Sequence, residues 1–261
     1  MNQTKIGIIG VGVVGGALKK YFEKQEHIKL FLYDKGKKIG SIEKVSEADF
    51  IYICVPTSTV KGYCDTSIVK GVIKQIRGEN KIIIIKSTVV PGTTESIQSE
   101  LPNYKILFNP EFLTEKTADQ DLSSPDRQII GFTKNSYNIS KRVMLQLPSA
   151  PFEMIIPATE AEVAKYFSNC WFVTKVIFAN QIYEVCQRLG IDYNRVKEVA
   201  AADKKIGRTH LDVFHDGYRG FKGKCLPKDL EAYINFTKNL GFEDKLLKTV
   251  KEINDELVPQ K

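Results

Sequence analysis

Residues 5–18 read KIGIIGVGVVGGAL and join a strand-like run to a helix-like segment through spaced glycines. Gly10, Gly12 and Gly15 form the pattern G-x-G-x-x-G. Between a strand and a helix, the first glycine permits the tight turn, the second lets the backbone approach a pyrophosphate, and the third lets the helix pack on the strand. The helix N-terminus adds a positive field. The stretch therefore predicts dinucleotide binding, the alternative being that the glycines serve only to turn the chain.

The second strand-like run, IKLFLYD at residues 28–34, ends in Asp34, about 20 residues beyond the glycines, as in dinucleotide-binding folds. A carboxylate there can bond the adenosine ribose 2′-hydroxyl and repels a 2′-phosphate. We therefore expect NAD rather than NADP as the cofactor. Lys35, Lys37 and Lys38 keep the alternative open, because they can pair with a phosphate.

Further apolar runs alternate with helix-length polar segments. They are FIYICVP (50–56), KIIIIKS (81–87) and YKILFNP (104–110). Runs that are apolar on both faces are typical of a parallel sheet covered by helices. We therefore expect an α/β fold that begins with a doubly wound Rossmann-like parallel sheet, in an NAD-binding domain over residues 1–157.

The texture of the sequence changes at Pro157. Residues 158–189 contain no Gly or Pro, and their apolar residues recur at helical spacing, which predicts one long helix. Thr159 with Glu162 fits a capping box at its start, and Gly190 a stop. At about 1.5 Å per residue the helix would exceed roughly 40 Å, so we expect it to bridge two parts or two subunits.

Shorter helical segments follow near residues 193–201, 228–240 and 242–257. Together with the long helix they predict a small all-helical central domain over residues 158–261. We expect a homodimer through the long helix, although a long amphipathic helix also packs within one chain.

The composition is that of a soluble globular protein, with 261 residues, 43% hydrophobic and 26% charged. The net charge of +7 suits an anionic ligand, and the basic residues are too dispersed for a nucleic-acid arm. No membrane span or signal peptide is visible, so we expect a cytoplasmic protein. Five cysteines without C-x-x-C spacing and three histidines support neither a disulfide framework nor a metal site.

The loop YRGFKGKCLPKDL, residues 218–230, surrounds Cys225 with basic residues. They are Arg219, Lys222, Lys224 and Lys228. Cations favour the thiolate, and Pro227 suits the first turn of a helix whose positive end does the same, so both are expected to lower the thiol pKa. The pattern favours a nucleophilic cysteine, while a basic, glycine-containing loop that is only solvated is the alternative.

The chain resembles the UDP-glucose/GDP-mannose dehydrogenase family through a series of motifs in the same order and spacing. They are ICVPTS, KSTVVPGTT, FNPEFLTE, SSPDR, EVAKYFSN and GKCLPKD. The resemblance runs from the first strand to about residue 240. It implies NAD-dependent, four-electron oxidation of a nucleotide sugar such as UDP-glucose, from the C6 alcohol to the carboxylate, without release of the aldehyde.

The resemblance also implies catalytic roles. Cys225 would attack the aldehyde to give a thiohemiacetal, and a second oxidation would give a thioester. Glu115 and Asp229 are the matching carboxylates for the base that thioester hydrolysis needs. Lys165 and Asn169, on one helical face, would steady the developing alkoxide and bind a water. Without the resemblance, Glu115 and Asp229 would be interpreted as surface acids, and Lys165 and Asn169 as part of a solvated helix face.

Cofactor and substrate contacts are implied in the same way, and Thr88 is similar to the threonine that touches both the reaction water and the cofactor. The residues expected at NAD are Gly10, Gly12, Val13, Val14, Gly15, Asp34, Lys35, Val55, Pro56, Thr57, Ser87, Thr88, Glu115 and Lys228. Those expected at the sugar nucleotide are Glu111, Phe112, Leu113, Lys165, Asn169, Lys205, Gly220 and Gly223. An orienting role for Glu111 is as compatible with the motif as a catalytic one, and Arg127 is expected to be a structural ion-pair partner.

The sequence also departs from the family pattern. Members usually continue into a second Rossmann-like domain that grips the nucleotide, whereas this sequence ends at Lys261 and is expected to be a short form. Lys205 stands where an arginine commonly reaches a neighbouring subunit's sugar. Lys222 and Lys224 add cations that can replace diphosphate contacts. Two alternatives stay open: an NAD-binding module that needs a separate substrate chain or has lost catalysis, and a two-electron hydroxyacid dehydrogenase.

Overall fold

The computed structural model describes residues 3–215 and 217–258, and the chain divides into two compact units. The first unit comprises the residues up to Ser58 together with Asp65–Lys165, and the second comprises Thr59–Cys64 together with the residues from Tyr166 on. The domain boundary between residues 157 and 158 stays a prediction. The predicted domains also include residues 1–2, 216 and 259–261, which lie outside the described residues.

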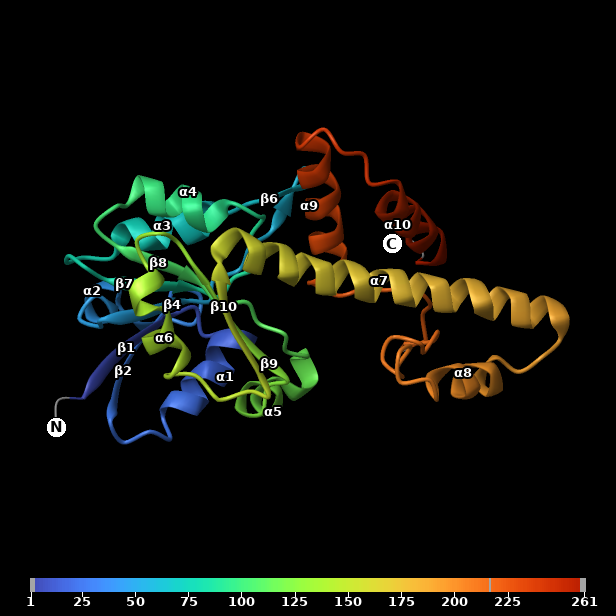
Figure 1. Ribbon diagram of the computed structural model, residues 1–261, viewed down its shortest axis with the longest axis horizontal. Helices are drawn as coiled ribbons and strands as arrows, with labels where there is room; N and C mark the ends of the chain where they lie inside the picture. The colour runs from blue at the N-terminus through green and yellow to red at the C-terminus, as the bar shows by residue number, and fades with distance from the viewer. Residues whose placement is uncertain (1–2, 216, 259–261) are drawn as a thin grey trace. The chain divides into compact units, whose positions relative to one another are not determined.

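The first unit is built on a sheet whose central strands are all parallel (Figure 1). They are β1 (Thr4–Ile9), β2 (Ile28–Asp34), β4 (Phe50–Ile53), β7 (Ile82–Ile85) and β8 (Lys105–Phe108). Their order in the sheet is β8-β7-β4-β1-β2. The chain adds β2 on one side of β1 and then β4, β7 and β8 on the other side, so the strand order reverses between β1 and β4. All five are the apolar runs identified in the sequence, and the doubly wound fold class is confirmed.

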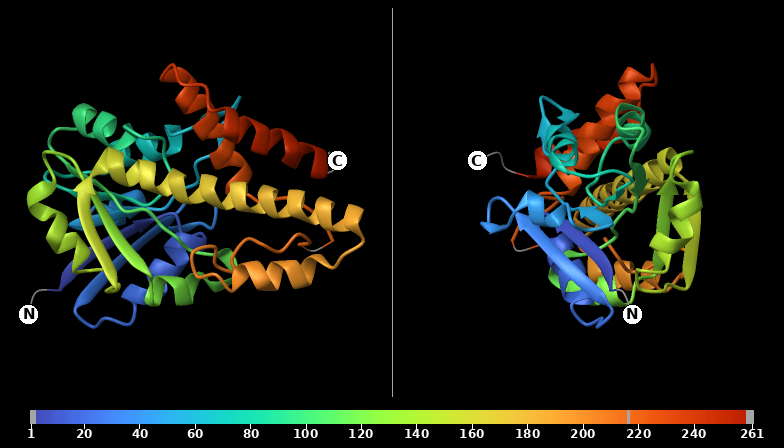
Figure 2. Two further views of the ribbon diagram at one scale, coloured as in Figure 1. Left: turned by 45° about the vertical axis from the view of Figure 1, so that its right-hand side comes forward. Right: turned by 90° about the vertical axis from the view of Figure 1, so that its left-hand side faces the viewer.

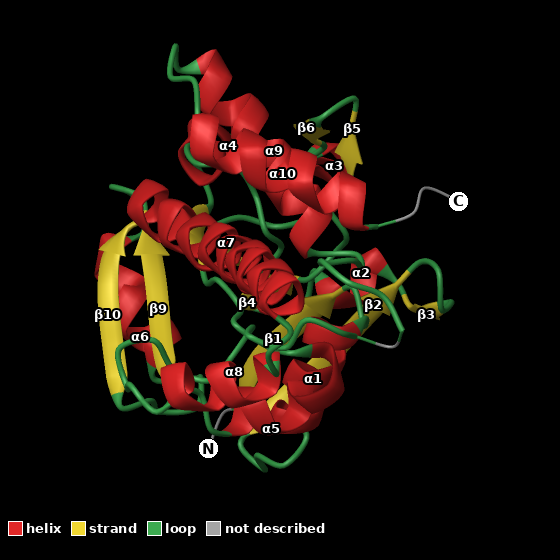
Figure 3. Cartoon of the chain, turned by 90° about the vertical axis from the view of Figure 1, so that its right-hand side faces the viewer, coloured by secondary structure: helices red, strands yellow, loops and turns green. Residues whose placement is uncertain are grey.

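Additional strands extend both edges of this sheet. The two-residue strand β3 (Ile39–Gly40) is antiparallel to β2. At the other edge, β9 (Arg127–Phe132) is antiparallel to β8, and β10 (Phe152–Pro157) lies parallel beside β9 (Figure 3). The side chains of β10 are mostly exposed, so it lacks the buried apolar run that identified the central strands.

Helices cover both faces of the sheet (Figure 2), and a separate apolar core lies on each face. One face packs against α2 (Ile42–Val45), α3 (Ser67–Gln75), α4 (Thr93–Glu100) and the start of α7. The other packs against α1 (Val13–Phe22), α5 (Ala118–Ser123) and α6 (Ser140–Met144), next to the short turns η1 (Glu115–Thr117) and η2 (Tyr137–Ile139). Along β4, Ile51 and Ile53 enter the first core while Phe50 and Tyr52 enter the second, as alternation in a strand requires.

The long helix α7 spans Ala158–Leu189, as predicted, and belongs to the first unit up to Lys165. It ends at Gly190, whose φ of 65° is the left-handed conformation that glycine adopts without strain. The predicted capping box is wrong, because Thr159 lies inside the first turn. The buried Glu162 carboxylate instead accepts hydrogen bonds from the backbone N–H groups of Gly92 (2.6 Å) and Thr94 (2.8 Å) at the start of α4.

The second unit combines the part of α7 from Tyr166 on with α8 (Tyr193–Ala201), α9 (Leu226–Asn239), α10 (Lys245–Leu257) and a hairpin formed by β5 (Thr59–Val60) and β6 (Tyr63–Cys64). Val173 and Ile177 of α7 pack with Leu230 of α9 and Val250 of α10. The sequence predicts the three shorter helices to within about three residues at each end. The hairpin was not predicted; Asn235 of α9 donates a side-chain hydrogen bond to its Gly62 carbonyl at 2.9 Å.

No helix in the described part of the chain is both long and apolar enough to cross a membrane.

Candidate active site

The glycine loop has the geometry that each glycine was expected to provide. Gly10 has a φ of 90°, and a Cβ on it would lie 2.6 Å from the Cys54 carbonyl oxygen. A Cβ on Gly15 would lie 1.9 Å from the Gly10 carbonyl oxygen, so the turn and the first residues of α1 require glycine there. A Cβ on Gly12 would meet nothing within 4 Å, which leaves open space where a pyrophosphate would approach. Val13 and Val14 form the first turn of α1.

Asp34 ties the glycine loop to the end of β2. Its Oδ2 accepts the Val11 N–H at 2.7 Å, and its Oδ1 accepts the Lys37 N–H at 2.8 Å. Burial acts to raise the pKa of Asp34, but the hydrogen bonds from Lys37 and Val11 and the Lys37 charge outweigh it, so this pKa lies below its ordinary value. An ionised carboxylate beside the loop fits the ribose hydroxyls of a dinucleotide. Lys35 is exposed, and the Lys37 ammonium binds the Val11 carbonyl.

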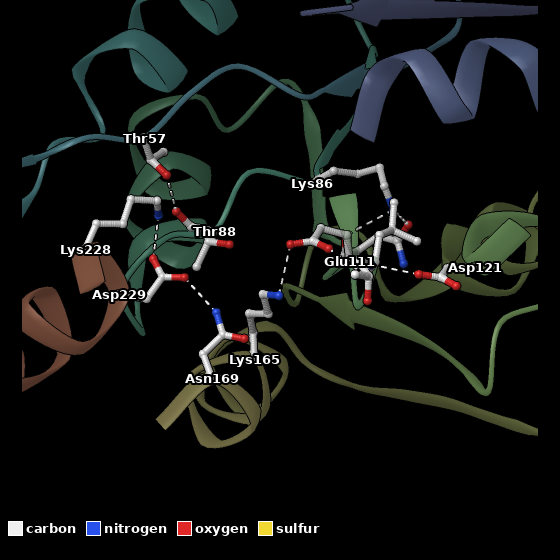
Figure 4. Close-up of polar contacts among 12 residues, drawn as sticks. Thr57, Lys86, Thr88, Glu111, Asp121, Lys165, Asn169, Lys228 and Asp229 are labelled. Carbon is white, nitrogen blue, oxygen red and sulfur yellow. Dashed lines mark hydrogen bonds and ion pairs between the residues drawn. The ribbon is translucent and has the colours of Figure 1, made fainter. Parts of the chain in front are cut away.

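The carboxyl ends of β4 and β7 are tied together by two side-chain hydrogen bonds. Ser87 Oγ donates to the Val55 carbonyl at 2.6 Å. Thr57 Oγ1 donates to the Thr88 carbonyl at 2.7 Å (Figure 4). Ligands of open α/β sheets bind at this edge, on either side of the point where the strand order reverses. The predicted residues of these two loops, Pro56 included, therefore lie together at the edge where a cofactor is expected.

The NPEFL segment after β8 places Glu111 against Lys165. The Glu111 carboxylate accepts the Leu113 N–H at 2.8 Å, and the Lys165 ammonium lies 2.9 Å from it (Figure 4). Burial acts to raise the pKa of Glu111, but the charge of Lys165 and the Leu113 N–H leave it below its ordinary value. The Phe112 ring packs beneath two cations, with the Lys165 Nζ 5.5 Å and the Arg127 guanidinium 3.8 Å from its centroid.

Glu115 lies in the 3-10 turn η1 and is exposed on the first unit. The neighbouring residue Thr114 donates its backbone N–H to a different carboxylate, Asp121 Oδ2, at 2.8 Å. The role expected for Glu115 as base and cofactor contact stays a prediction.

In the second unit, Cys225, Lys228 and Asp229 occupy the start of α9. Cys225 is the exposed N-cap residue, and its carbonyl accepts the Asp229 N–H at 3.0 Å. Asp229 is 2% exposed, and its Oδ2 accepts the Asn169 amide at 2.7 Å while its Oδ1 bonds the Lys228 ammonium (Figure 4). The first turn of α9 thus carries an accessible thiol and a buried carboxylate that is fixed from two directions.

Three predicted substrate contacts lie in the loops before α9. Lys205 is exposed in the turn after α8, where its N–H donates to Asp203 Oδ1 at 2.9 Å. Gly220 has a φ of 77°, and a Cβ on it would lie 2.5 Å from Asn254 Oδ1. Gly223, with a φ of 91°, has open space around its Cβ position. The Asn254 side chain holds this loop through both backbone groups of Phe221, a contact that no motif indicated.

Lys86 also lies at this edge of the sheet, and no sequence motif singles it out although KSTVVPGTT contains it. It follows four isoleucines of β7 and is 3% exposed, with its Nζ 2.6 Å from Asn109 Oδ1. Burial lowers the pKa of Lys86 to about 8, against the opposing influence of Cys54 and Glu111. A charged side chain placed directly after a fully buried strand is the pattern that would have identified it.

Within residues 3–215 and 217–258 there is no cluster of three or more His, Cys, Asp or Glu side chains that could hold a metal ion.

The fold, the glycine loop and Asp34 together define a Rossmann-type dinucleotide-binding protein. Residues 36–147 match the NAD binding domain of the UDP-glucose/GDP-mannose dehydrogenase family, and residues 159–256 match its central domain. The chain belongs to this family, and its cofactor is NAD. The resemblance and the cofactor predicted from the sequence are both confirmed.

Curated relatives are similar over most of the chain. It is 34% identical over 227 residues to a UDP-glucose 6-dehydrogenase of Bacillus subtilis, covering 81% of this chain and 47% of that protein. Identity to the UDP-glucose 6-dehydrogenase of Rickettsia conorii is 30% over 294 aligned residues, covering 98% and 67%. The structure of a UDP-glucose dehydrogenase from the archaeon Pyrobaculum islandicum matches with a TM-score of 0.82 at 27% identity, covering 98% and 68%. The chain spans about half the length of the first two curated relatives it matches.

Proposed function

We propose that this chain carries out the NAD-dependent, four-electron oxidation of a nucleotide sugar such as UDP-glucose, converting its C6 alcohol to the uronic acid through covalent intermediates on Cys225. The observation that supports this most is the first turn of α9. There the exposed Cys225 thiol stands one turn from Asp229, a buried carboxylate held by Asn169 and Lys228. A thiol and a fixed base on one turn suit the formation and hydrolysis of a thioester.

The first unit supplies the groups for alcohol oxidation. The glycine loop and Asp34 hold NAD, which when bound accepts one hydride in each of the two oxidations. Loss of a hydride from the alcohol carbon requires its hydroxyl proton to leave, so negative charge develops on that oxygen. The Lys165 ammonium, oriented by Glu111 at 2.9 Å, stabilises this charge, and a water accepts the proton.

The Cys225 thiol then prevents release of the aldehyde. Its sulfur forms a bond to the aldehyde carbon while the thiol proton passes to the aldehyde oxygen, giving a thiohemiacetal. Loss of a hydride from that carbon and of the hydroxyl proton gives a thioester. Water, deprotonated by Asp229 or Glu115, breaks the carbon–sulfur bond, which yields the carboxylic acid and restores the thiol. One alcohol and one water thus give one carboxylate and two NADH.

We propose that a homodimer forms through α7. Phe167, Trp171, Phe178, Val185 and Leu189 are each at least half exposed. They recur every four or seven residues and so form one apolar stripe along the helix. Another face of α7, which includes Val173 and Ile177, is already buried within the second unit. An exposed stripe of this size is typical of a protein–protein interface, and a second copy of α7 has the matching chemistry.

The test of the proposed function is the number of NADH molecules made per molecule of sugar. The purified full-length chain is incubated with NAD and a panel of UDP- and GDP-sugars, with the variant C225S alongside. We expect two NADH per substrate for the unaltered chain, and loss of the second NADH in C225S. One NADH together with indifference to C225A would support a two-electron hydroxyacid dehydrogenase instead. No oxidation, despite NAD binding measured by calorimetry, would support a binding module and overturn the proposal.

A further inference from the structure

We propose that Lys86 is a positioning residue of the alcohol-oxidation site, which fixes Asn109 and through it the Glu111 carboxylate that meets Lys165. The proposal rests on the function proposed above and names a residue that its mechanism does not use. It follows from three observations in the first unit: where Lys86 is held, what Asn109 is attached to, and which charges face the ammonium.

Lys86 is buried at the carboxyl end of β7, between the neighbouring strands β4 and β8. Its Nζ donates to Asn109 Oδ1 at 2.6 Å and lies 3.4 Å from the Asn109 carbonyl oxygen (Figure 4). Both acceptors are neutral, so neither compensates the cost of burying an ammonium as a carboxylate would. A methionine of similar shape would avoid this cost, and stability alone therefore does not account for a lysine here.

Asn109 is fully buried and is fixed from the other side by β9 and the segment that follows it. Its Nδ2 donates to Gln128 Oε1 at 2.9 Å and to the Ile129 carbonyl at 2.8 Å. Gln128 in turn donates to the Pro148 carbonyl at 3.3 Å. Lys86 supplies the donor for the remaining end of the amide, so it determines which way the Asn109 side chain lies.

Glu111 stands two residues after Asn109, across the rigid Pro110. Its carboxylate has two anchors of its own, the Leu113 N–H and the Lys165 ammonium. A change in the direction of the chain at Asn109 therefore reaches the Glu111–Lys165 pair with only one residue between. A misplacement of about 1 Å at a reacting group lowers rates by about a hundredfold.

The ionisable groups around Lys86 leave a surplus of positive charge near the Glu111–Lys165 pair. The charged neighbours are Glu111 from the segment after β8 and Lys165 from α7, and the Cys54 thiol at the end of β4 is a third ionisable neighbour. Burial raises the pKa of Cys54 to about 12, so its thiol is neutral at ordinary pH. Glu111 thus lies in the field of two ammonium groups, of which only Lys165 pairs with it directly, and the remaining positive charge favours an alkoxide that forms beside Lys165. The same field helps to keep Glu111 ionised, because the charge of Lys86 lowers the Glu111 pKa.

The test compares K86M with K81M in the full-length chain. Lys81 directly precedes β7 as Lys86 directly follows it, and its ammonium donates to the Ala48 carbonyl at 2.9 Å, so K81M removes a matched lysine from the opposite end of the strand. We expect K86M to lower kcat for the first oxidation by about tenfold or more, with the KM for NAD unchanged. We expect the acid limb of its pH profile to move to higher pH, since a carboxylate that loses a nearby cation becomes easier to protonate. K81M should change neither, and equal profiles for K86M and K81M would overturn the proposal.

A second readout needs no turnover and separates this proposal from the proposed function. In protein labelled with ¹³Cδ-glutamate, the Glu111 resonance is identified by its absence from E111Q. We expect its titration to move to higher pH in K86M and to stay in place in K81M, whether or not any sugar is oxidised. An unchanged titration in K86M would overturn the proposal while leaving the proposed function untouched. Should K86M not fold, K86Q, which keeps a donor toward Asn109 and loses the charge, takes its place with the same expected shift.

Discussion

The buried Asp229 carboxylate accepts the Asn169 side-chain amide at 2.7 Å, joining the start of α9 to α7 inside the second unit. Its other oxygen bonds Lys228, the residue before it in the chain. A carboxylate with both oxygens occupied has a fixed direction, which is what a base acting on a bound water requires. Asp229 is therefore the residue of this unit from which the hydrolysis step can best be tested.

We expect D229N to form the thioester but to hydrolyse it slowly. Steady-state turnover should fall by about a hundredfold or more, because general-base catalysis contributes factors of that size. The first turnover should still release two NADH, and intact-mass spectrometry should show the acyl-enzyme. The matched control is D255N, which removes an exposed acid of α10 paired with Lys251. Rapid turnover in D229N would transfer the role to Glu115, testable by E115Q.

The exposed thiol of Cys225 should be the first of the chain's cysteines to be alkylated. Cys170 and Cys186 are buried, and burial raises the pKa of Cys170 to about 12, so its thiolate is scarce at neutral pH. We expect one equivalent of iodoacetamide to label the peptide that contains Cys225 and to abolish the second oxidation. Peptide mass mapping after brief labelling measures the distribution. Labelling of Cys170 ahead of Cys225 would contradict the assignment.

The basic loop before Cys225 should contribute to the binding of an anionic substrate. We expect the double variant K222A/K224A to raise the KM for a sugar nucleotide by about tenfold and to leave the KM for NAD nearly unchanged. The double variant K245A/K248A, which removes two cations from the first turn of α10, is the control for net charge. Equal increases for both substrates would remove the role assigned to the loop.

Glu162 should make the stability of the fold depend on pH. Burial raises the pKa of its carboxyl to about 7, against the hydrogen bonds from Thr94 and Gly92. The folded state therefore holds a proton that the unfolded state releases near pH 4.5, and the free energy of unfolding falls as the pH rises from about 4.5 to about 7. E162Q keeps the shape of the protonated form and should remove this slope. Urea unfolding at a series of pH values measures it, and parallel curves for the two proteins would refute the expectation.

The apolar stripe of α7 should hold two chains together. We expect F178D to convert a dimer into a monomer in sedimentation velocity, because a charge at the centre of an apolar interface is costly to bury. F242D, at an exposed phenylalanine outside α7, is the control and should leave the mass unchanged. A monomer in the unaltered chain would refute the proposed dimer.

The sequence predicts best those elements that are buried on both sides. Residues 82–85 are four isoleucines covered on both faces, so β7 appears as an unbroken apolar run. Strand β10 cannot be predicted in this way because it lies at an edge of the sheet and its side chains are mostly exposed. The β5–β6 hairpin cannot be predicted because each of its strands is only two residues long. The bounds of α7 are predicted because neither Gly nor Pro interrupts it.

Contacts between distant residues limit what could be predicted of the site. The motifs identified Glu111, Lys165, Asn169 and Asp229, but their pairing depends on how strand ends and helices come together in space. The capping box failed for the same reason, since Glu162 found stronger partners 68 and 70 residues away, in Thr94 and Gly92. Local spacing describes what a side chain can do along its own helix, and tertiary contacts can override it.

The β5–β6 hairpin belongs to the second unit although the residues on both sides of it belong to the first. The polypeptide consequently passes from one unit to the other three times, after Ser58, after Cys64 and after Lys165. Neither unit can be cloned as one uninterrupted fragment: an excised piece that starts at Tyr166 would leave the Asn235 amide of α9 without the Gly62 carbonyl it bonds. A single protease cut after Lys165 would leave the β5–β6 hairpin covalently joined to the first unit, while the residues from Tyr166 on would be held to that hairpin by noncovalent contacts such as the Asn235–Gly62 hydrogen bond.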